Sequence, residues 1–472
     1  VYWNQRMFLA TGDAKYVDVL ERTLYNGLLA GGSLSGDKFF YDNPLASDGH
    51  AERAPWFGCA CCPGNVTRFV ASVPGYAYAT DKNDIYVNLY VEGNTKIAVE
   101  SGSVELVQKT QYPWDGNVEI AVNPEEKTNF SLLLRVPGWS KNQPVPTDLY
   151  KYVDAVSSQV KIKVNGKETK HKIRGGYAVI DHAWKQGDVV SIQMDMPVRR
   201  VQAHEKSEYS KGLLSMERGP IVYALESVDQ GKDYVFDIMI PRETKIESRF
   251  EKDLLNGVTV LEGDAFTVAK DKESGSLTQT PVKFKAIPYS TWNNRGAGQL
   301  VVWTPESAEY AIPQPEPTIA SKATSIDAWG MNDLFEPKSS ADVNTPYQYW
   351  WLKSGTEESV SYQFEKPETV SSVEVYWLAF EHYDVIYKAP ESWKLLYKEG
   401  NTWKEVEGAT PYGTELDKYN KVTFKPVTTT ELKIVAQLQR PNTEKAADEK
   451  GPQVVEVGRR GFSGGIIEWK VN

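Results

Sequence analysis

The spacing of apolar residues changes at about residue 79 of this 472-residue chain, and this change limits the folds that the chain can adopt. From there on, apolar and polar residues alternate as in Ile85-Tyr86-Val87-Asn88-Leu89-Tyr90-Val91, which is typical of strands. Further short strands are predicted at 96–100, 118–122, 130–136, 160–164, 177–180 and 189–194, with turns at 165–166 and 186–188. Because no helical pattern separates these segments, they predict antiparallel β-sandwiches.

The first 30 residues are predicted to form two helices. Residues 1–7 continue a helical pattern to a turn at 11–13, and a second helix follows with Val17, Leu20, Leu24 and Leu28 on one face. Asp13 is the expected N-cap, and glycines 31 and 32 are the expected stop. Two helices cannot bury such a face alone. We therefore expect the face to pack against upstream helices that this chain lacks, which would make the chain a fragment.

The rest of the chain is predicted to be β-rich. A second β stretch runs from about 212 to 303, and the proline-rich residues 312–317 are predicted to form a linker. After it, Val373, Val375 and Trp377 alternate, and 466–471 forms a last strand. The predicted domains are a helical part at 1–78, a β-sandwich at 79–200, a second β domain at 201–312 and a further β-sandwich at 318–472.

Composition narrows the choice of partners. The formal net charge of −10 argues against nucleic acid or an anionic membrane surface. No apolar stretch reaches the about 20 residues that span a bilayer. Fourteen tryptophans and 26 tyrosines are many for so polar a chain, and exposed rings of this kind can stack on sugars, although most of them are expected in cores.

All three cysteines lie within four positions, Cys59-Ala60-Cys61-Cys62. Three thiols cannot all pair with one another, and the chain has no other cysteine. Pro63 and the apolar spacing that follows it predict a helix whose N-terminus carries Cys61 and Cys62, where unpaired N–H groups favour a thiolate. A zinc ligand set or a reactive thiolate is therefore predicted.

Two other interpretations of the cluster stay open at this stage. The cysteines could be buried and inert, because a free cysteine often behaves as a small hydrophobe. A structural zinc site usually needs two pairs of ligands, and this chain offers one such cluster. His50 is the nearest histidine, but a histidine in a loop is more often solvated than bound to metal.

Six segments, in this order, resemble a known family. They are Tyr25-Asn26-Gly27, Phe39-Phe40-Tyr41-Asp42-Asn43-Pro44-Leu45, Cys59-Ala60-Cys61-Cys62-Pro63-Gly64-Asn65, Tyr86-Val87-Asn88-Leu89-Tyr90, Arg135-Val136-Pro137-Gly138-Trp139 and Arg218-Gly219-Pro220-Ile221-Val222-Tyr223. Over roughly residues 1–310 the chain resembles the β-L-arabinofuranosidases of glycoside hydrolase families 127 and 146. Residues 336–469 are similar to a discoidin-like (F5/8 type C) β-sandwich, a possible carbohydrate-binding module.

The resemblance implies a multidomain fold, in which the last helices of an (α/α)6 barrel precede antiparallel β-sandwich domains. It implies a retaining glycosidase acting on β-L-arabinofuranosides of plant-type glycans. Cys61 would be the nucleophile, Cys61 and Cys62 zinc ligands, and Glu21 and Tyr41 residues that bind the sugar. Without the family, Glu21 would be interpreted as a solvated helix carboxylate and Tyr41 as a core or sheet aromatic.

The chain also departs from the family pattern. The family supplies a Glu-x-Cys zinc-ligand pair and the general acid/base from segments upstream of the helix that opens this chain, so residues 1–472 alone are expected to be inactive. A discoidin-like tail suggests a periplasmic or secreted glycan-degrading protein.

Two other functions are compatible with the residues. A non-catalytic carbohydrate-binding protein with a structural zinc–cysteine cluster would need only the sandwiches and exposed rings, with Trp350 and Trp351 as candidates, although at least one of this adjacent pair is expected in the core. A thiol-redox protein would use the cysteines, but no Cys-x-x-Cys motif in a βαβ unit is present.

Overall fold

The computed structural model describes residues 1–472 except 155, 157, 272–273, 316–317, 327–329, 344, 352, 383–384 and 441–460. The chain divides into two units, Val1–Gln314 and Pro315–Asn472. This division falls inside the predicted linker, of which positions 316 and 317 lie outside the described residues. No helix in the described ranges is long and apolar enough to cross a membrane.

The helices of the first unit lie mainly at its start. The helical segments are α1 (Tyr2–Thr11), α2 (Ala14–Arg22), the π-helix η1 (Thr23–Leu28), α3 (Cys61–Ser72), η2 (Val73–Tyr76), η3 (Gly138–Lys141), η4 (Glu208–Ser210), α4 (Ser227–Gln230), η5 (Tyr289–Thr291) and η6 (Ala308–Tyr310). As predicted, Gly12 ends α1 in a left-handed conformation, and the Asp13 carboxylate caps α2 by accepting from the N–H of Lys15. An (α/α)6 barrel is not confirmed, because the described residues before position 78 form only these few helices.

The middle of the first unit is a β-sandwich. Its six-stranded sheet contains β10 (Lys167–Glu168), β9 (Val160–Val164), β13 (Asp188–Met194), β6 (Asn117–Pro124), β5 (Gly102–Thr110) and β4 (Gly93–Val99), in that order. Its five-stranded sheet contains β11 (Lys172–Arg174), β12 (Tyr177–Trp184), β7 (Thr128–Arg135), β3 (Asp84–Val87) and β2 (Tyr78–Asp81). The predicted strands are therefore present, but Asn88 to Val91 lie beyond the end of β3. Pairing is antiparallel except between β3 and β7.

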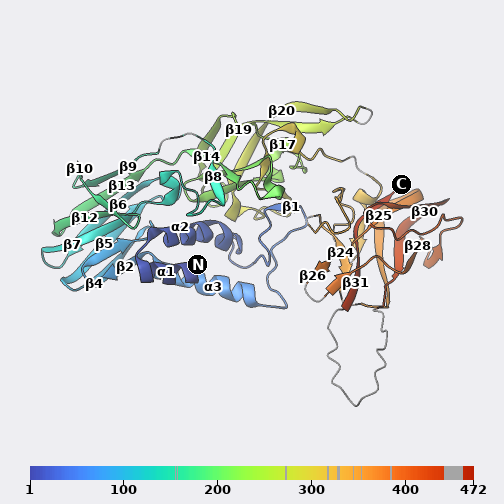
Figure 1. The fold of residues 1–472 in the computed structure, drawn as a ribbon, viewed down its shortest axis with the longest axis horizontal. Helices are drawn as coiled ribbons and strands as arrows, with labels where there is room; N and C mark the ends of the chain where they lie inside the picture. Colours follow the sequence, from blue (N-terminus) through green and yellow to red (C-terminus); the bar gives the residue numbers. More distant parts are fainter. Residues whose placement is uncertain are drawn as a thin grey trace, which may run out of the picture. The chain divides into compact units, whose positions relative to one another are not determined.

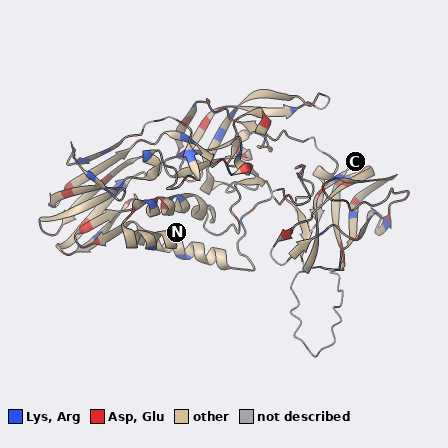
Figure 2. Cartoon of the chain, in the orientation of Figure 1, with Lys and Arg blue, Asp and Glu red and all other residues tan. Residues whose placement is uncertain are grey.

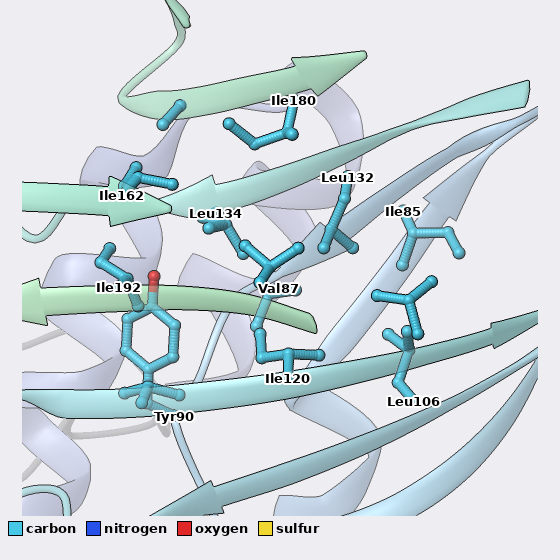
Figure 3. Close-up of a cluster of buried hydrophobic side chains, with 14 of the residues drawn as sticks. Ile85, Val87, Tyr90, Leu106, Ile120, Leu132, Leu134, Ile162, Ile180 and Ile192 are labelled. Atoms are coloured by element: carbon cyan, nitrogen blue, oxygen red, sulfur yellow. The ribbon is translucent and has the colours of Figure 1, made fainter. Parts of the chain in front are cut away.

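The two sheets share one apolar core. Ile120 and Ile192 of the six-stranded sheet meet Val87 and Leu132 of the five-stranded sheet, as Figure 3 shows. The predicted turn at Asn165-Gly166 joins β9 to β10, with both residues at positive φ. Along the strands of the six-stranded sheet, alternation thus places one set of side chains in the core and the other set on the outer face of the sandwich.

The outer face of the five-stranded sheet is covered by the first helices, which lie beside it in Figure 1. Val17, Leu20 and Leu24 of the helical segment pack in one cluster with Leu133 and Tyr177 of the sheet. The expectation that this apolar face needs helices from outside the chain is therefore wrong, since a sheet buries it. Because β7 is covered on both faces, it has a run of consecutive buried leucines instead of an alternating pattern.

A third sheet completes the first unit. It contains β17 (Ile238–Met239), β19 (Val258–Lys270), β20 (Leu277–Pro288), β16 (Ile221–Glu226), β15 (Leu213–Arg218), β14 (Val198–Ala203) and β8 (Tyr150–Tyr152), with β1 (Ala46–Asp48), β18 (Ile246–Glu251), β21 (Gln299–Val301) and β22 (Thr304–Pro305) paired to its strands. Strand β14 crosses the boundary predicted at 200/201, and β1 comes from the N-terminal segment. Segments assigned to different predicted domains therefore contribute strands to this one sheet.

In the second unit, the described residues form strands and loops apart from the short turn η7 (Ala320–Lys322). Its nine-stranded sheet contains β26 (Glu381–His382), β27 (Val385–Tyr387), β31 (Gly461–Val471), β25 (Glu357–Trp377), β30 (Asn420–Gln437), β28 (Ser392–Glu399) and β29 (Thr402–Glu405), with β23 (Thr324–Ile326) and β24 (Gln348–Trp350) paired to it. Val373, Val375 and Trp377 are all buried, as their alternation predicts. Figure 2 shows basic and acidic residues interspersed along the strands of both units.

Glu468, on β31, is a buried carboxyl group in the core of the second unit. Burial, followed by the negative charge of Asp333, raises its pKa from the ordinary 4.5 to about 10, although Lys470 acts in the opposite direction. The folded chain therefore holds a proton here that the unfolded chain releases above its ordinary pKa. The contribution of Glu468 to stability is then complete below pH 4.5 and is lost as the pH rises toward the folded-state pKa.

We expect Glu468→Gln to remove this loss. The unfolding free energy of the second unit should fall by about 1 kcal/mol per pH unit between pH 6 and 9 in the unaltered chain and much less in the variant. Urea denaturation at three pH values measures the slope. Glu391→Gln, at an exposed position of the same unit, is the control and should keep the unaltered slope. Equal slopes for all three proteins would show that Glu468 is ionised in the folded chain.

Candidate functional site

The three thiols meet at the start of α3. Cys61 is the first residue of this helix, and its Sγ lies 3.6 Å from Cys59 Sγ and 3.6 Å from Cys62 Sγ. A disulfide would need about 2.05 Å, so all three cysteines are free. Cys59 and Cys61 are exposed. The interpretation of an inert buried cluster is therefore wrong, and the predicted place of Cys61 and Cys62 at a helix N-terminus is confirmed.

Local contacts fix the start of α3. Asn65 donates from its side chain to the carbonyl of Cys61 at 2.8 Å, and Thr67 donates to the carbonyl of Pro63 at 3.0 Å. One turn further on, Phe69 is buried, and its ring meets that of Tyr2 edge-on with centroids 5.5 Å apart. The helix is thus held by its buried face while its first residues and their thiols stay accessible.

Tyr41 lies beside the thiols. The neighbouring sulfurs, with Cys61 first, raise the pKa of the Tyr41 hydroxyl, because a negative charge nearby disfavours the phenolate. The Tyr41 side chain is 52% exposed, which makes the interpretation as a core aromatic wrong. Phe57 meets its ring edge-on at 5.4 Å. The structure therefore brings together Tyr41 and the three cysteines, which are twenty residues apart in the sequence.

A buried anchor holds the segment that carries Tyr41. The ring of Phe40 stacks on Trp292 with centroids 4.9 Å apart, and the Arg53 guanidinium lies 4.3 Å above Phe40. Arg53 also donates to the carbonyls of Ala30 and Trp292, the latter at 2.7 Å. Phe40 belongs to the core of the third sheet, so that sheet positions the exposed residue next to it.

Glu21 lies in a different environment. It is 1% exposed, so the interpretation as a solvated carboxylate is wrong. Its Oε1 accepts from Tyr112 Oη at 2.7 Å and forms an ion pair with the fully buried Arg135. Burial raises the pKa of Glu21, and Arg135 opposes this. The hydrogen-bond partners of Glu21 are thus neither the cysteines nor Tyr41.

Arg135 is a structural residue that the sequence did not reveal. It pairs with Asp18 at 2.7 Å as well as with Glu21, and its Nε donates to the carbonyl of Asn88 at 2.6 Å. Its two carboxylate partners lie more than one hundred residues away on α2, so no local pattern could identify them. Apart from its place in a family-like segment, the available signal is an arginine directly after three leucines of a strand, since a charge at a buried position needs a partner.

His50 contacts Asp48. Its Nδ1 lies 3.1 Å from Asp48 Oδ2. In the described residues no group of three histidine, cysteine or acidic side chains is arranged to hold a metal ion. The interpretation of His50 as a solvated loop histidine fits its half-exposed side chain.

Comparisons with known proteins show the family of the chain. Models of the β-L-arabinofuranosidase GH127 catalytic domain, the GH127 middle domain and the glycoside hydrolase family 127 C-terminal domain match residues 1–75, 84–196 and 198–305. A non-reducing end beta-L-arabinofuranosidase of Bifidobacterium longum subsp. longum is 30% identical over 325 residues, which are 63% of this chain and 46% of that protein.

Two solved structures are similar as well. A GH127 beta-arabinofuranosidase is 41% identical with a TM-score of 0.64, covering 66% of this chain and 49% of the other. A GH127 beta-L-arabinofuranosidase from Geobacillus stearothermophilus T6 is 38% identical with a TM-score of 0.59, covering 65% and 48%. The chain spans about half the length of these relatives. It belongs to glycoside hydrolase family 127.

The ion pair of Glu21 can be tested by Glu21→Gln. The variant keeps the side-chain volume but removes one of the two charges that face the buried Arg135, so we expect the first unit to lose about 3 kcal/mol of unfolding free energy. Guanidinium denaturation measures this loss. Glu125→Gln breaks the exposed ion pair with Lys96 and should cost less than about 1 kcal/mol. A Glu21 variant as stable as this control would contradict the structural role.

Proposed function

We propose that this chain forms part of a retaining β-L-arabinofuranosidase in which the Cys61 thiolate is the nucleophile. The observation that carries the proposal is the exposed Cys61 thiol at the start of α3, flanked by two other thiols and by Tyr41, in a chain of glycoside hydrolase family 127. The relatives named above are described as arabinofuranosidases. Arabinose-containing plant-type glycans are the proposed substrates.

The proposed chemistry has two steps. Cys61 Sγ attacks the anomeric carbon, the bond from this carbon to the leaving oxygen breaks, and a general acid protonates that oxygen. Water then attacks the same carbon of the thioglycosyl intermediate, gives up a proton to the conjugate base and releases the thiolate. Two inversions retain the configuration. The acid/base is not among the residues assigned here, so it is proposed to come from elsewhere in the protein.

A zinc ion fits the spacing of the thiols. Two sulfurs bound to one tetrahedral zinc at about 2.3 Å lie about 3.8 Å apart, and Cys61 and Cys62 are 3.6 Å apart. We propose these two residues as ligands of a site that other groups complete. When bound, zinc would favour the thiolate form of cysteine. Cys59 is equally close to Cys61, but the resemblance assigns it no role.

Tyr41 and Glu21 enter the proposal differently. The Tyr41 hydroxyl is exposed next to the nucleophile, where it can donate to a sugar oxygen or to the thiolate. The role of Glu21 in sugar binding stays a prediction, because Arg135 and Tyr112 already occupy its Oε1. A raised KM with an unchanged kcat in a folded Glu21→Gln protein would support contact with the sugar.

The nucleophile assignment predicts a difference between neighbouring thiols. In the full-length protein, Cys61→Ser should lower kcat for an aryl β-L-arabinofuranoside at least about a thousandfold, because a serine hydroxyl is not ionised at neutral pH and binds soft metals poorly. Cys59→Ser is the matched control and should retain most of the activity. Mass spectrometry of the quenched enzyme should show a sugar adduct on the peptide with Cys61.

Three outcomes would contradict the proposal. Activity of Cys61→Ser within a few-fold of the unaltered enzyme would exclude the nucleophile role. A reversible Cys59–Cys62 disulfide in a protein without glycosidase activity would favour the thiol-redox function instead. A protein that binds arabinose-containing glycans but never hydrolyses them would favour the non-catalytic alternative.

We further propose that the second unit is a discoidin-like sandwich that binds glycans. Trp350 is buried, whereas its neighbour Trp351 is 52% exposed, and the Trp351 ring lies 6.1 Å from that of Tyr349, which is 44% exposed. Exposed rings next to each other are suited to contact the apolar faces of sugars. A periplasmic or extracellular location would give such a unit access to plant-type glycans.

Trp351→Ala tests this second role. The variant should bind soluble arabinan about two- to tenfold more weakly, since one aromatic contact contributes about 0.5–1.5 kcal/mol. Leu416→Ala removes another exposed apolar side chain of the same unit and should leave the affinity unchanged. Affinity electrophoresis of both variants makes the comparison. Equal retardation of the two would show that Trp351 does not contribute to glycan binding.

A further inference from the structure

The outer face of the six-stranded sheet contains a polar hollow of about 520 Å³. Its walls come from strands β5, β6, β9 and β13 and from the loop between β5 and β6. This volume lies within the range of small-molecule sites in proteins. The hollow involves none of the cysteines, Tyr41 or Glu21, so it is separate from the candidate active site.

The strand register builds the floor of the hollow. Across the sheet, Lys109 is opposite Glu119, Glu119 is opposite Ser191, and Ser191 is opposite Lys163. Residues opposite each other project from the same face, so these four side chains form a continuous row about 14 Å long across four strands. On the other face, residues such as Ile120 and Ile192 fill the sandwich core.

A second polar row lies next to the first. Asn117 is opposite Gln193, and Gln193 is opposite Lys161. Gln111, Asp115 and Glu92 complete the rim. The floor therefore presents ammonium, carboxylate, amide and hydroxyl groups, which include both donors and acceptors of hydrogen bonds.

The loop between β5 and β6, which forms one wall of the hollow, is held in place by contacts with other parts of the first unit. The Tyr112 hydroxyl donates to the buried Glu21, and Arg218 donates to the carbonyl of Trp114 at 2.8 Å. At Gly116 the loop touches the backbone of Met194 so closely that an added Cβ would lie 1.9 Å from the Met194 oxygen. The hollow is thus part of the folded framework.

The charges of the hollow balance. Three lysines (109, 161 and 163) face three carboxylates (92, 115 and 119). Within the ranges that the structure describes, none of the three lysines has a carboxylate within ion-pair distance. The apolar lining residues, Val118 and Ile192, have buried side chains. This lining suits a polar ligand without net charge, such as one rich in hydroxyl groups, since a nucleic acid or acidic polymer would meet the carboxylates and an apolar peptide would find no anchor.

We infer that this hollow is a second, non-catalytic binding site for a neutral glycan chain. Lysine, carboxylate and amide groups pair with neighbouring sugar hydroxyls, each of which donates and accepts. The row is long enough for several sugar residues, and the absence of an exposed ring implies binding through hydrogen bonds. The inference goes beyond the proposed hydrolysis, and it rests on that proposal only for the choice of an arabinose-containing probe.

The test uses a variant that leaves the net charge unchanged. Glu119→Ala with Lys163→Ala removes two groups of the central row, and we expect the dissociation constant for a neutral linear arabino-oligosaccharide to rise about tenfold or more. The matched control is Glu105→Ala with Lys167→Ala, at exposed positions of the same sheet outside the hollow, which should leave the affinity unchanged. Gln193→Ala, which alters no charge, should weaken binding independently.

Titration calorimetry is performed with Cys61→Ser in every protein, so that hydrolysis does not consume the ligand. Circular dichroism and thermal unfolding verify that each variant is folded. Three results would each overturn the inference. These are equal affinities of the hollow variant and the control, no binding of the neutral oligosaccharide, and tighter binding of an oligogalacturonate. Because turnover is measured separately in proteins that retain Cys61, an inactive protein that still binds through Glu119 and Lys163 would contradict the proposed hydrolysis alone.

Discussion

The first unit depends most on the contacts that pair the buried guanidinium of Arg135. Transfer of this charge into the interior is unfavourable unless it is paired, and here Asp18, Glu21 and the carbonyl of Asn88 surround it. These partners come from α2 and from the end of β3, so one cation joins the helices to the sandwich. Through the Tyr112 hydroxyl the same group of contacts reaches the loop that forms the wall of the polar hollow.

Separate contacts of buried aromatic rings hold the thiol site. Phe40, stacked on Trp292 and covered by Arg53, fixes the segment before Tyr41 on the third sheet, while Phe69 fixes α3 on the first helix. Of the accessible groups, Tyr41 directly follows the buried Phe40, and Cys61 lies on the same helix as the buried Phe69. Rigid apolar contacts thus position reactive groups that themselves remain open to solvent, as a site for a soluble substrate requires.

Local chemistry made several features predictable from the sequence. The Asp13 cap, the turn at Asn165-Gly166 and the start of a helix at Cys61 each follow from a few neighbouring residues. The partners of long-range contacts could not be predicted in this way. Strand β14 is not among the predicted strands, and the helical pattern around Val17 indicates a buried face but not the sheet that buries it.

Glu21 shows the same limit for the candidate site, because its partner Arg135 lies 114 positions away. Several segments that carry the family resemblance form joints between elements. Asn26 donates to the carbonyl of Pro220 at 2.9 Å and accepts from the N–H of Val222, and Arg218 binds the loop at Trp114. The thiol segment and the segment of Tyr41 instead present exposed groups. Most of the segments that carry the resemblance therefore reflect how the sheets and helices of this chain are joined. The proposed activity instead depends on a few accessible atoms around Cys61, so it has to be tested at those atoms.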